Sequence, residues 1–327
     1  MRTCLVTPAP ARSRKGNRVT ALRWARLLRE LGHRVTVAQR YDGQRCDLLV
    51  VLHAGRSADS VARFRADHPD QPLVVTLTGT DLYGDIHTSA EARRSLELAS
   101  RLVVLQPLGV EALPRPLRHK ARVIYQSVPT PAFRVRRRDD VFEVCVLGHL
   151  RPVKDPFRTA EAARLLPSSS RVRVLHLGAA LSAGMADQAR AEEAANPRYR
   201  WLGERPRWQA LRTLARCRLL ALTSELEGGA NVISEALAVS VPVVASRIAG
   251  TVGLLGPDYP GYFPFGDTEA LAALLRRAET DAPFYRALEV QCRRQRALFQ
   301  PARERQAWAR LLKELRPKLR SGRDGAW

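Results

Sequence analysis

The stretch that decides the fold is LLALTSELEGGANVISEALAVSVPVVAS, residues 219–246. It begins with an apolar run, 219–223, that is typical of a buried strand. It continues through two glycines into a segment, 232–238, whose apolar residues have helical spacing. A second apolar run, 242–246, follows. A strand, a helix and a strand in this order predict two parallel strands joined by a right-handed crossover.

The same alternation extends over most of the chain. The strand-sized apolar runs are 4–7, 35–38, 48–53, 73–78, 102–105 and 123–125, and then 141–147, 172–177, 199–202, 219–223 and 242–246. A polar segment with two prolines, 129–140, separates the two series. We therefore predict an α/β fold of two Rossmann-like, doubly wound domains that face each other across a cleft. The expected domains are 1–135 and 136–300, followed by a helical segment, 301–327.

Composition limits what this chain can be. Its 327 residues are 45% hydrophobic, which indicates a folded protein rather than a disordered one. No apolar run approaches the roughly 18 residues of a membrane helix. Pro8 and Pro10 interrupt the apolar stretch at the N-terminus, so we predict no signal peptide. The five cysteines are scattered and form no CxxC pair, which is typical of reduced thiols. We expect a cytoplasmic protein without stable membrane insertion.

The chain is strongly basic, with 54 Lys and Arg against 32 Asp and Glu, a net charge of +22. Such a charge is compatible with nucleic acid, a membrane surface or anionic small molecules. The excess lies in residues 1–140 and 286–327, whereas the part between them is close to neutral. An aromatic content of 6% and the lack of a reader motif argue against nucleic acid. We expect Arg23, Arg26 and Arg29 on the outer face of a helix over 20–31, which leaves a membrane-surface role open.

Ligands of doubly wound sheets bind beyond the carboxyl ends of the strands, so the loops after the apolar runs are the candidate sites. The loop after 219–223 carries Glu227 and two glycines, which let a ligand approach the backbone closely. The next helix carries Glu235, and its first amides, around 231–233, can bind phosphate oxygens. The alternative is that Glu227 caps a turn and Glu235 is a solvated helix residue. The helix and strand that continue the pattern favour a site.

A second candidate loop follows the apolar run 141–147 and carries Gly148, Arg151 and Lys154. Two cations three residues apart after a glycine suit a nucleotide diphosphate, because Arg offers a planar fork of donors and Lys a compact charge. Arg is abundant in this chain, so a nearby pair of cations is common by itself. Its position at the start of the second domain strengthens it.

Two further loops belong to the first domain. Residues Lys15, Gly16, Asn17 and Arg18 lie between the first strand and the first helix, where an anion or a sugar can bind, and the alternative is a solvated basic loop. Residues Gly79, Thr80 and Asp81 follow the run 73–78. Asp81 could orient a sugar hydroxyl, or it could form an Asx-turn or helix cap. No P-loop, GxGxxG or metal-ligand spacing occurs, so we expect no NAD, ATP or metal cofactor.

The run from Glu227 to Ser246 resembles the donor-binding signature of glycosyltransferases of the GT-B fold, in the family 4 group. This resemblance implies that Glu227 contacts the donor sugar near the transferred carbon and that Glu235 binds the ribose hydroxyls. It implies that Arg151 and Lys154 neutralise the leaving diphosphate, so that Glu227, Arg151 and Lys154 form the catalytic set. The full implied donor site is Gly148, Arg151, Lys154, Gly178, Leu202, Glu227, Gly228, Gly229, Ala230, Asn231, Val232 and Glu235. Ser240 stands where the family usually has Gly, and we expect it to alter local packing only.

The whole chain is similar to a narrower group, the selenosugar synthases of selenoneine biosynthesis. The matching segments are 7–10, 15–21, 33–37, 41–43, 77–83 and 259–263. The similarity implies transfer of a sugar from UDP-N-acetylglucosamine or UDP-glucose to selenophosphate, which forms a carbon–selenium bond and then a 1-selenosugar. We place the anionic acceptor near Lys15, Gly16, Asn17, Arg18, Gly79, Thr80 and Asp81. The GT-B resemblance also implies that the final helix, within 301–327, crosses back to the first domain.

Three alternatives remain open from the sequence. The same enzyme class could use a sugar, lipid or natural-product acceptor. A sugar-nucleotide epimerase could share the fold, because fold alone does not decide function. The third is a nucleic-acid-binding protein. The stereochemistry is also open, because the family 4 signature suggests retention at the anomeric carbon, whereas direct attack by a reactive anion would invert it.

Overall fold

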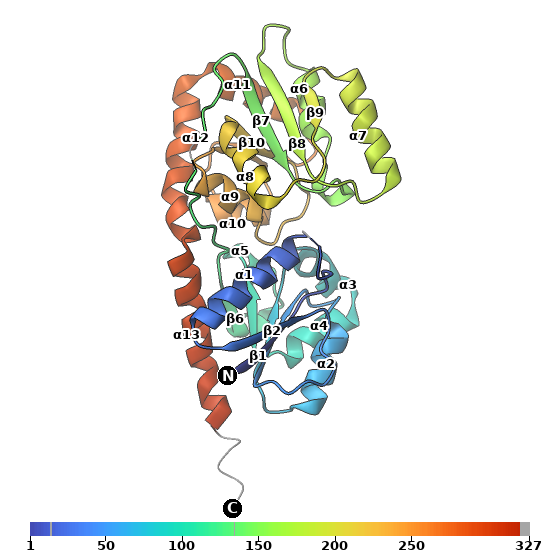
Figure 1. The fold of residues 1–327 in the computed structure, drawn as a ribbon, viewed down its shortest axis with the longest axis vertical. Helices are drawn as coiled ribbons and strands as arrows, with labels where there is room; N and C mark the ends of the chain where they lie inside the picture. The colour runs from blue at the N-terminus through green and yellow to red at the C-terminus, as the bar shows by residue number, and fades with distance from the viewer. Residues whose placement is uncertain (14, 134, 321–327) are drawn as a thin grey trace, which may run out of the picture. The chain divides into compact units, whose positions relative to one another are not determined.

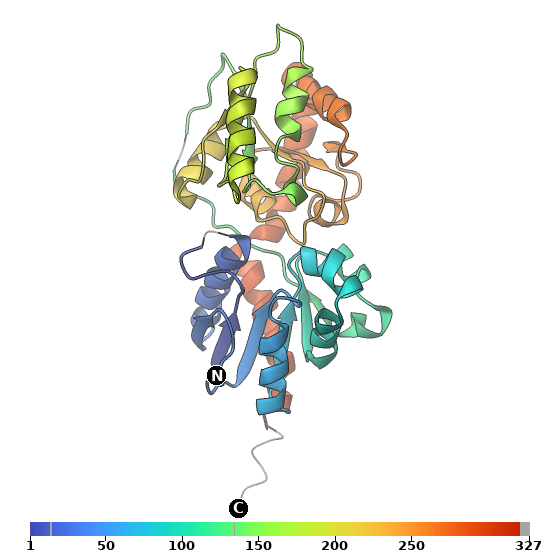
Figure 2. The ribbon, with the colours of Figure 1, turned by 90° about the vertical axis from the view of Figure 1, so that its right-hand side faces the viewer.

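The computed structural model describes residues 1–13, 15–133 and 135–320. It contains two compact units, each with a parallel sheet that is covered by helices on both faces (Figures 1 and 2). The first unit comprises Met1–Ser127 together with α13, which begins at Pro301, and the second comprises Val128–Gln300. The predicted α/β class with two doubly wound sheets is confirmed. The final residues of the expected segment 301–327, from 321 onward, lie outside the described residues.

The first unit contains a six-stranded sheet in the order β2-β1-β3-β4-β5-β6, and every pairing in it is parallel. Its strands are β1 (Arg2–Val6), β2 (Arg34–Ala38), β3 (Leu48–Leu52), β4 (Leu73–Thr76), β5 (Arg101–Val104) and β6 (Ala121–Val123). β3 is apolar at all five positions and buried throughout, as expected for a strand with helices on both sides. The strand order reverses between β1 and β3, so the loops after these two strands diverge at this point.

Helices cover both faces of this sheet. They are α1 (Gly16–Glu30), α2 (Ala58–Asp67), α3 (Ile86–Thr88), α4 (Ala90–Leu98), α5 (Leu108–Glu111) and α13 (Pro301–Arg320), with shorter turns at Asp81–Asp85 and Arg115–Lys120. α1 and α13 pack on one face, where the rings of Trp24 and Trp308 lie 4.8 Å apart edge to face. α2 and α4 pack on the other face around Phe64 and Leu96 (Figure 1).

α13 is fixed to the first unit by a buried carboxylate near its start. Glu304 accepts hydrogen bonds from the Trp24 indole (2.6 Å), from the Arg23 guanidinium (3.2 Å) and from the amide and hydroxyl of Ser127 (3.0 and 2.5 Å). The prediction that Arg23 lies on the outer face of α1 is therefore wrong. Its side chain is only 7% exposed, because it is paired with a carboxylate that α13 brings to the inner face. Arg26 and Arg29 are exposed, as expected.

The second unit contains another parallel sheet, in the order β12-β11-β10-β7-β8-β9. Its strands are β7 (Phe142–Leu147), β8 (Val172–Leu177), β9 (Tyr199–Trp201), β10 (Leu219–Leu222), β11 (Val243–Ser246) and β12 (Tyr262–Phe263). Its helices are α6 (Arg158–Arg164), α7 (Ala183–Ala195), α8 (Arg207–Arg216), α9 (Asn231–Ala238), α10 (Ala249–Leu255), α11 (Thr268–Thr280) and α12 (Ala282–Gln295), with turns at Pro152–Lys154 and Arg296–Phe299. The strand order reverses between β7 and β10, which places the loops after these strands at the switch point.

Within the described residues, no helix is both long and apolar enough to cross a membrane. All five cysteines are buried and unpaired. The chain after Pro283 is helical in two parts, because a tight turn over Arg296–Phe299 separates α12 from α13.

Candidate functional site

The candidate site of the second unit begins with two loops that are bonded to each other. The loop after β10 reaches the loop after β7 through three hydrogen bonds: the Glu225 amide donates to the Val153 carbonyl (3.0 Å), and the Thr223 hydroxyl donates to the carbonyls of Lys154 (3.0 Å) and Asp155 (2.8 Å). Asp155 has a left-handed backbone (φ 43°), which turns the chain directly after Lys154. The two loops that carried the strongest sequence motifs are therefore joined at the switch point.

This joining brings Lys154 and Glu227 into direct contact. The Lys154 ammonium lies 2.5 Å from Oε1 of Glu227, and the Ser224 hydroxyl donates to the same oxygen at 2.8 Å. The Glu227 side chain is 11% exposed and that of Lys154 is 29% exposed. An ammonium has three N–H donors, so two remain for a ligand after the bond to Glu227. The site thus presents a nearly buried carboxylate and a partly exposed cation side by side.

Small buried residues surround Glu227. Gly228, Gly229 and Ala230 are buried, and α9 begins at Asn231 without a side-chain cap at its N-terminus. Gly250, at the start of α10, lies directly against Glu227, because an added Cβ would lie 1.9 Å from the Glu227 carbonyl oxygen. Neither Gly250 nor Ser224 was predicted from the sequence as a site residue. The only signal for Gly250 is the small-residue run 249–251 after a predicted strand.

The second predicted carboxylate, Glu235, lies in α9 and has a different partner. The guanidinium of Arg207, the first residue of α8, donates to Oε1 of Glu235 at 3.0 Å, and the Glu235 side chain is 10% exposed. Arg207 was also missed by the sequence analysis. Arg151 begins the turn Pro152–Lys154, and its side chain forms no hydrogen bond or ion pair with the part of the chain that the structure describes. Glu227 therefore pairs with Lys154 and Glu235 with Arg207.

Gly148, Gly178 and Leu202 form a backbone frame beside these loops. Gly178 packs against the Gly148 carbonyl so closely that an added Cβ would lie 1.8 Å from it. The buried ring of His176 bonds the same carbonyl through Nε2 (3.2 Å) and the Tyr199 hydroxyl through Nδ1 (3.0 Å). Burial lowers the pKa of His176 to about 4, so the ring is neutral at pH 7. The Leu202 amide donates to the His176 carbonyl (2.8 Å), which completes the frame.

In the first unit the two predicted acceptor loops meet. The Asn17 side-chain amide lies 3.5 Å from the Thr78 hydroxyl, at the carboxyl ends of β1 and β4. Lys15 is exposed and immediately precedes α1, whose first turn, beginning at Gly16, contains no acidic residue. Within the described residues, Nε of Arg18 is buried and has no hydrogen-bond partner. The start of α1 therefore has Lys15 directly before it and Arg18 in its first turn, and that turn contains no acidic residue.

Asp81 is occupied by the protein itself. It is fully buried, and its two oxygens accept from the amides of Thr78 (2.8 Å), Gly79 (2.9 Å) and Ala54 (2.9 Å). This is the turn-forming role that the sequence left as an alternative. Thr80 instead bonds His53 Nε2 at 3.1 Å, and the Arg56 amide donates to Nδ1 of the same ring. The amide of Arg56 donates to Nδ1, so in the neutral ring Nε2 carries the proton. The Thr80 hydroxyl then accepts a hydrogen bond from the Nε2–H group.

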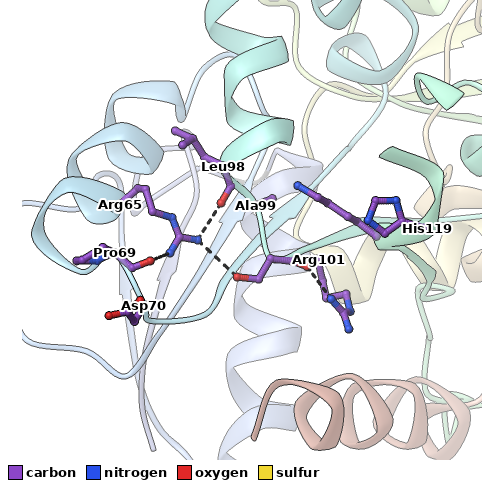
Figure 3. Close-up of a pocket in the computed structure, with 9 residues that line it drawn as sticks. Arg65, Pro69, Asp70, Leu98, Ala99, Arg101 and His119 are labelled. Atoms are coloured by element: carbon purple, nitrogen blue, oxygen red, sulfur yellow. Dashed lines mark hydrogen bonds between the residues drawn. The ribbon is translucent and has the colours of Figure 1, made fainter. Parts of the chain in front are cut away.

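A separate hollow of about 500 Å³ lies at the amino end of the same sheet (Figure 3). It is lined by Arg65, Pro69, Asp70, Leu98, Ala99, Ser100, Arg101, His119 and Lys120. Its cations are already used: Arg65 donates to the carbonyls of Leu98 (2.8 Å) and Pro69 (2.5 Å), and Lys120 donates to that of Glu97 (2.7 Å). The bonds to Leu98 and Glu97 satisfy carbonyls at the carboxyl end of α4, and the bond to Pro69 lies in the turn after α2, so both side chains already bind the protein's own backbone.

No group of three or more His, Cys, Asp or Glu side chains that could hold a metal ion occurs in the described ranges. The residues gathered beyond the carboxyl ends of the strands in the two units are cations, amides and single carboxylates. Such a set is suited to binding anions and hydroxyl groups.

A family model matches the second half of the chain, and solved structures resemble nearly all of it. The family model described as "Glycosyl transferases group 1" matches residues 130–295, which include every predicted donor-site residue. A search of curated proteins finds no match. Among solved structures, HepE of Anabaena in complex with UDP-glucose has a TM-score of 0.75 at 18% identity, over 95% of this chain and 99% of that one. Sucrose-phosphate synthase of Thermosynechococcus elongatus has a TM-score of 0.79 at 16% identity, over 97% and 99%. A glycosyltransferase of Rickettsia africae has a TM-score of 0.71 at 15% identity, over 96% and 98%. These likenesses show the predicted GT-B type of fold.

Proposed function

Since the chain belongs to the group 1 glycosyl transferases, we propose that it transfers a sugar from a UDP-sugar to selenophosphate, as a step of selenoneine biosynthesis. The observation that carries the donor half is the contact between Lys154 and Glu227 at the switch point of the second sheet. In this contact Lys154, a cation that can bind a diphosphate, lies next to Glu227, a carboxylate that can bind a sugar hydroxyl. The complex of Anabaena HepE with UDP-glucose supports a UDP-sugar as the donor class.

In this proposal the second unit binds the donor and stabilises its departing diphosphate. Arg151 and the two remaining donors of Lys154 bind the diphosphate, together with the N-terminus of α9 at Asn231 and Val232. Glu227 accepts a hydrogen bond from the sugar, and Glu235 accepts one from the ribose. Negative charge grows on the diphosphate as its bond to the sugar breaks, so fixed cations stabilise the transition state more than the ground state. These residues do the work without a metal ion.

The acceptor half rests on the sequence similarity to selenosugar synthases and on the charge of the first unit. Lys15 and Arg18, at the N-terminus of α1, supply positive charge for a small, multiply charged anion. Selenium of selenophosphate is already anionic, so it attacks the anomeric carbon without a general base. The carbon–selenium bond forms as the bond to UDP breaks, and UDP leaves with the electron pair. Water then cleaves the selenium–phosphorus bond, which releases phosphate and the 1-selenosugar.

The test is anaerobic incubation of the protein with selenophosphate and, in separate reactions, UDP-glucose and UDP-N-acetylglucosamine. Mass spectrometry follows UDP and the selenium-bearing sugar, and the proton coupling at the anomeric carbon gives the stereochemistry. The expected result is equal amounts of UDP and selenosugar with one of the two donors. Release of UDP without selenium in the product would assign the enzyme another acceptor, and release of neither product would overturn the proposal.

A further inference from the structure

We propose that Ser224 is a positioning residue that fixes one carboxylate oxygen of Glu227 and thereby leaves the other oxygen for the donor sugar. The inference rests on the proposed function, because it takes Glu227 as the group that contacts the sugar. It goes further by assigning separate tasks to the two oxygens and by naming the residue that separates them.

The two oxygens of Glu227 have different surroundings. Oε1 accepts from Ser224 Oγ at 2.8 Å and from Lys154 Nζ at 2.5 Å. Oε2 accepts no hydrogen bond from the described residues, and it is not among the polar atoms that are fully buried without a partner. A carboxylate held at one oxygen by two donors cannot rotate without losing both bonds. Oε2 therefore keeps one position, in which it can accept from a hydroxyl group.

The backbone of Ser224 is itself fixed by a hydrogen bond. The Ser246 hydroxyl, at the end of β11, donates to the Ser224 carbonyl at 2.5 Å. The Thr251 hydroxyl, in α10, donates to the Ser246 carbonyl at 2.6 Å. Ser224, Ser246 and Thr251 are all fully buried. Three buried hydroxyl groups thus connect α10 to Glu227: two donate to the backbone carbonyl of the next serine, and that of Ser224 donates to the carboxylate.

The two donors to Oε1 come from different loops. Lys154 reaches Glu227 from the loop after β7, whereas Ser224 reaches it from the loop after β10. Gly250 adds a third constraint by packing on the Glu227 backbone. Removal of the Ser224 hydroxyl should therefore loosen the carboxylate while the diphosphate contacts of Lys154 and Arg151 remain. The expected signature is a loss of affinity for the sugar part of the donor alone.

The experiment compares the binding of UDP and of UDP-sugars to Ser224→Ala by titration calorimetry, with UDP-glucose and UDP-N-acetylglucosamine as the probes. We expect the Kd of the preferred UDP-sugar to rise about tenfold, as for loss of a hydrogen bond to a charged group. The Kd of UDP should stay within about twofold. Equal weakening of both ligands, or of neither, would overturn the positioning role.

The matched control is Ser170→Ala. The Ser170 hydroxyl also donates to a carboxylate within the second unit, at 2.7 Å to Glu279, but it lies before β8, at the opposite end of the strands. It should change neither Kd.

If Ser224→Ala does not fold, Ser246→Ala is the second variant. It removes the hydrogen bond to the Ser224 carbonyl and leaves both donors to Glu227 in place. We expect it to raise the Kd of the UDP-sugar by a smaller factor than Ser224→Ala. An unchanged ratio of the Kd values of UDP-sugar and UDP would contradict the proposal.

Glu227→Gln separates this inference from the proposed function. If Glu227→Gln binds UDP-sugar and UDP like the unchanged protein, Glu227 is not the sugar contact and the donor half of the proposed function fails. If Glu227→Gln loses discrimination for the sugar while Ser224→Ala retains it, only the role of Ser224 fails. These experiments measure donor binding, so their outcome does not depend on which acceptor the enzyme uses.

Discussion

At the scale of single residues, the charge on Lys154 is the feature that the proposed chemistry depends on most. Lys154→Gln keeps an N–H donor on a side chain that is one atom shorter, but it removes the positive charge at the proposed diphosphate site. We expect kcat/KM for the donor to fall at least about a hundredfold, as when one preorganised donor is removed from a developing anion. Steady-state kinetics of UDP release measures it. Lys313→Gln, at an exposed position of α13, is the control, and equal activity of both variants would contradict the assignment.

His176 gives a second prediction at this scale, which concerns stability. Burial lowers its pKa from 6.5 to about 4 in the folded protein. The unfolded chain therefore binds a proton below pH 6.5 that the folded chain does not bind, so the folded state loses stability as the pH falls from 6.5 towards 4. The difference of pKa corresponds to about 3 kcal/mol. Denaturant unfolding at pH 7.5 and pH 4.5 should show that His176→Gln loses less stability than the unchanged protein by roughly this amount, and identical losses would contradict it.

The sequence predicted which residue types form the site but not which of them touch. Lys154 and Glu227 were both identified, yet they are 73 residues apart, and their contact depends on β10 lying next to β7. Hydrophobic periodicity reveals that a strand exists and not which strand is its neighbour. Arg23 shows the same limit. A charged helix residue is assigned to solvent by default, and its buried partner Glu304 lies 281 residues further along.

At the scale of elements, the end of α9 shows what the departure at Ser240 does. The amides of Ser240 and Val241 donate to the carbonyls of Leu237 and Ala236, which is the Schellman arrangement. This places Ser240 in the left-handed region (φ 57°), where a side chain is unfavourable. We expect Ser240→Gly to raise the free energy of unfolding of the second unit by about 0.5–1 kcal/mol, measured by denaturant titration.

α1 provides the reciprocal test. It ends with the same two bonds, from the amides of Gly32 and His33 to the carbonyls of Arg29 and Leu28. An added Cβ at Gly32 would meet no atom within 4 Å, so only the backbone conformation (φ 84°) opposes a side chain. Gly32→Ser should therefore destabilise by a similar amount. The same sign of change in both variants would show that backbone conformation does not control these helix ends.

At the scale of the whole molecule, the chain returns to its first unit through α13, so the stability of that unit depends on its C-terminal segment. The apolar side chains of Trp308, Leu311 and Leu315 lie in the same core as α1. Residues from both ends of the sequence thus form one core. The family model covers 130–295 only, and this closing helix lies beyond it.

Glu304 provides buried polar contacts between α13 and the rest of the first unit. Its buried carboxylate accepts from Arg23, Trp24 and Ser127. Glu304→Ala leaves a buried guanidinium and an indole N–H without their acceptor, which should cost about 3–5 kcal/mol of unfolding free energy. Glu314→Ala, on the same helix, removes partly exposed ion pairs with Arg101 and Arg122 and should cost no more than about 1 kcal/mol. Denaturant unfolding of both variants measures the difference. Equal losses would show that α13 is held by its apolar face alone, and that the acid at its start is dispensable to the first unit.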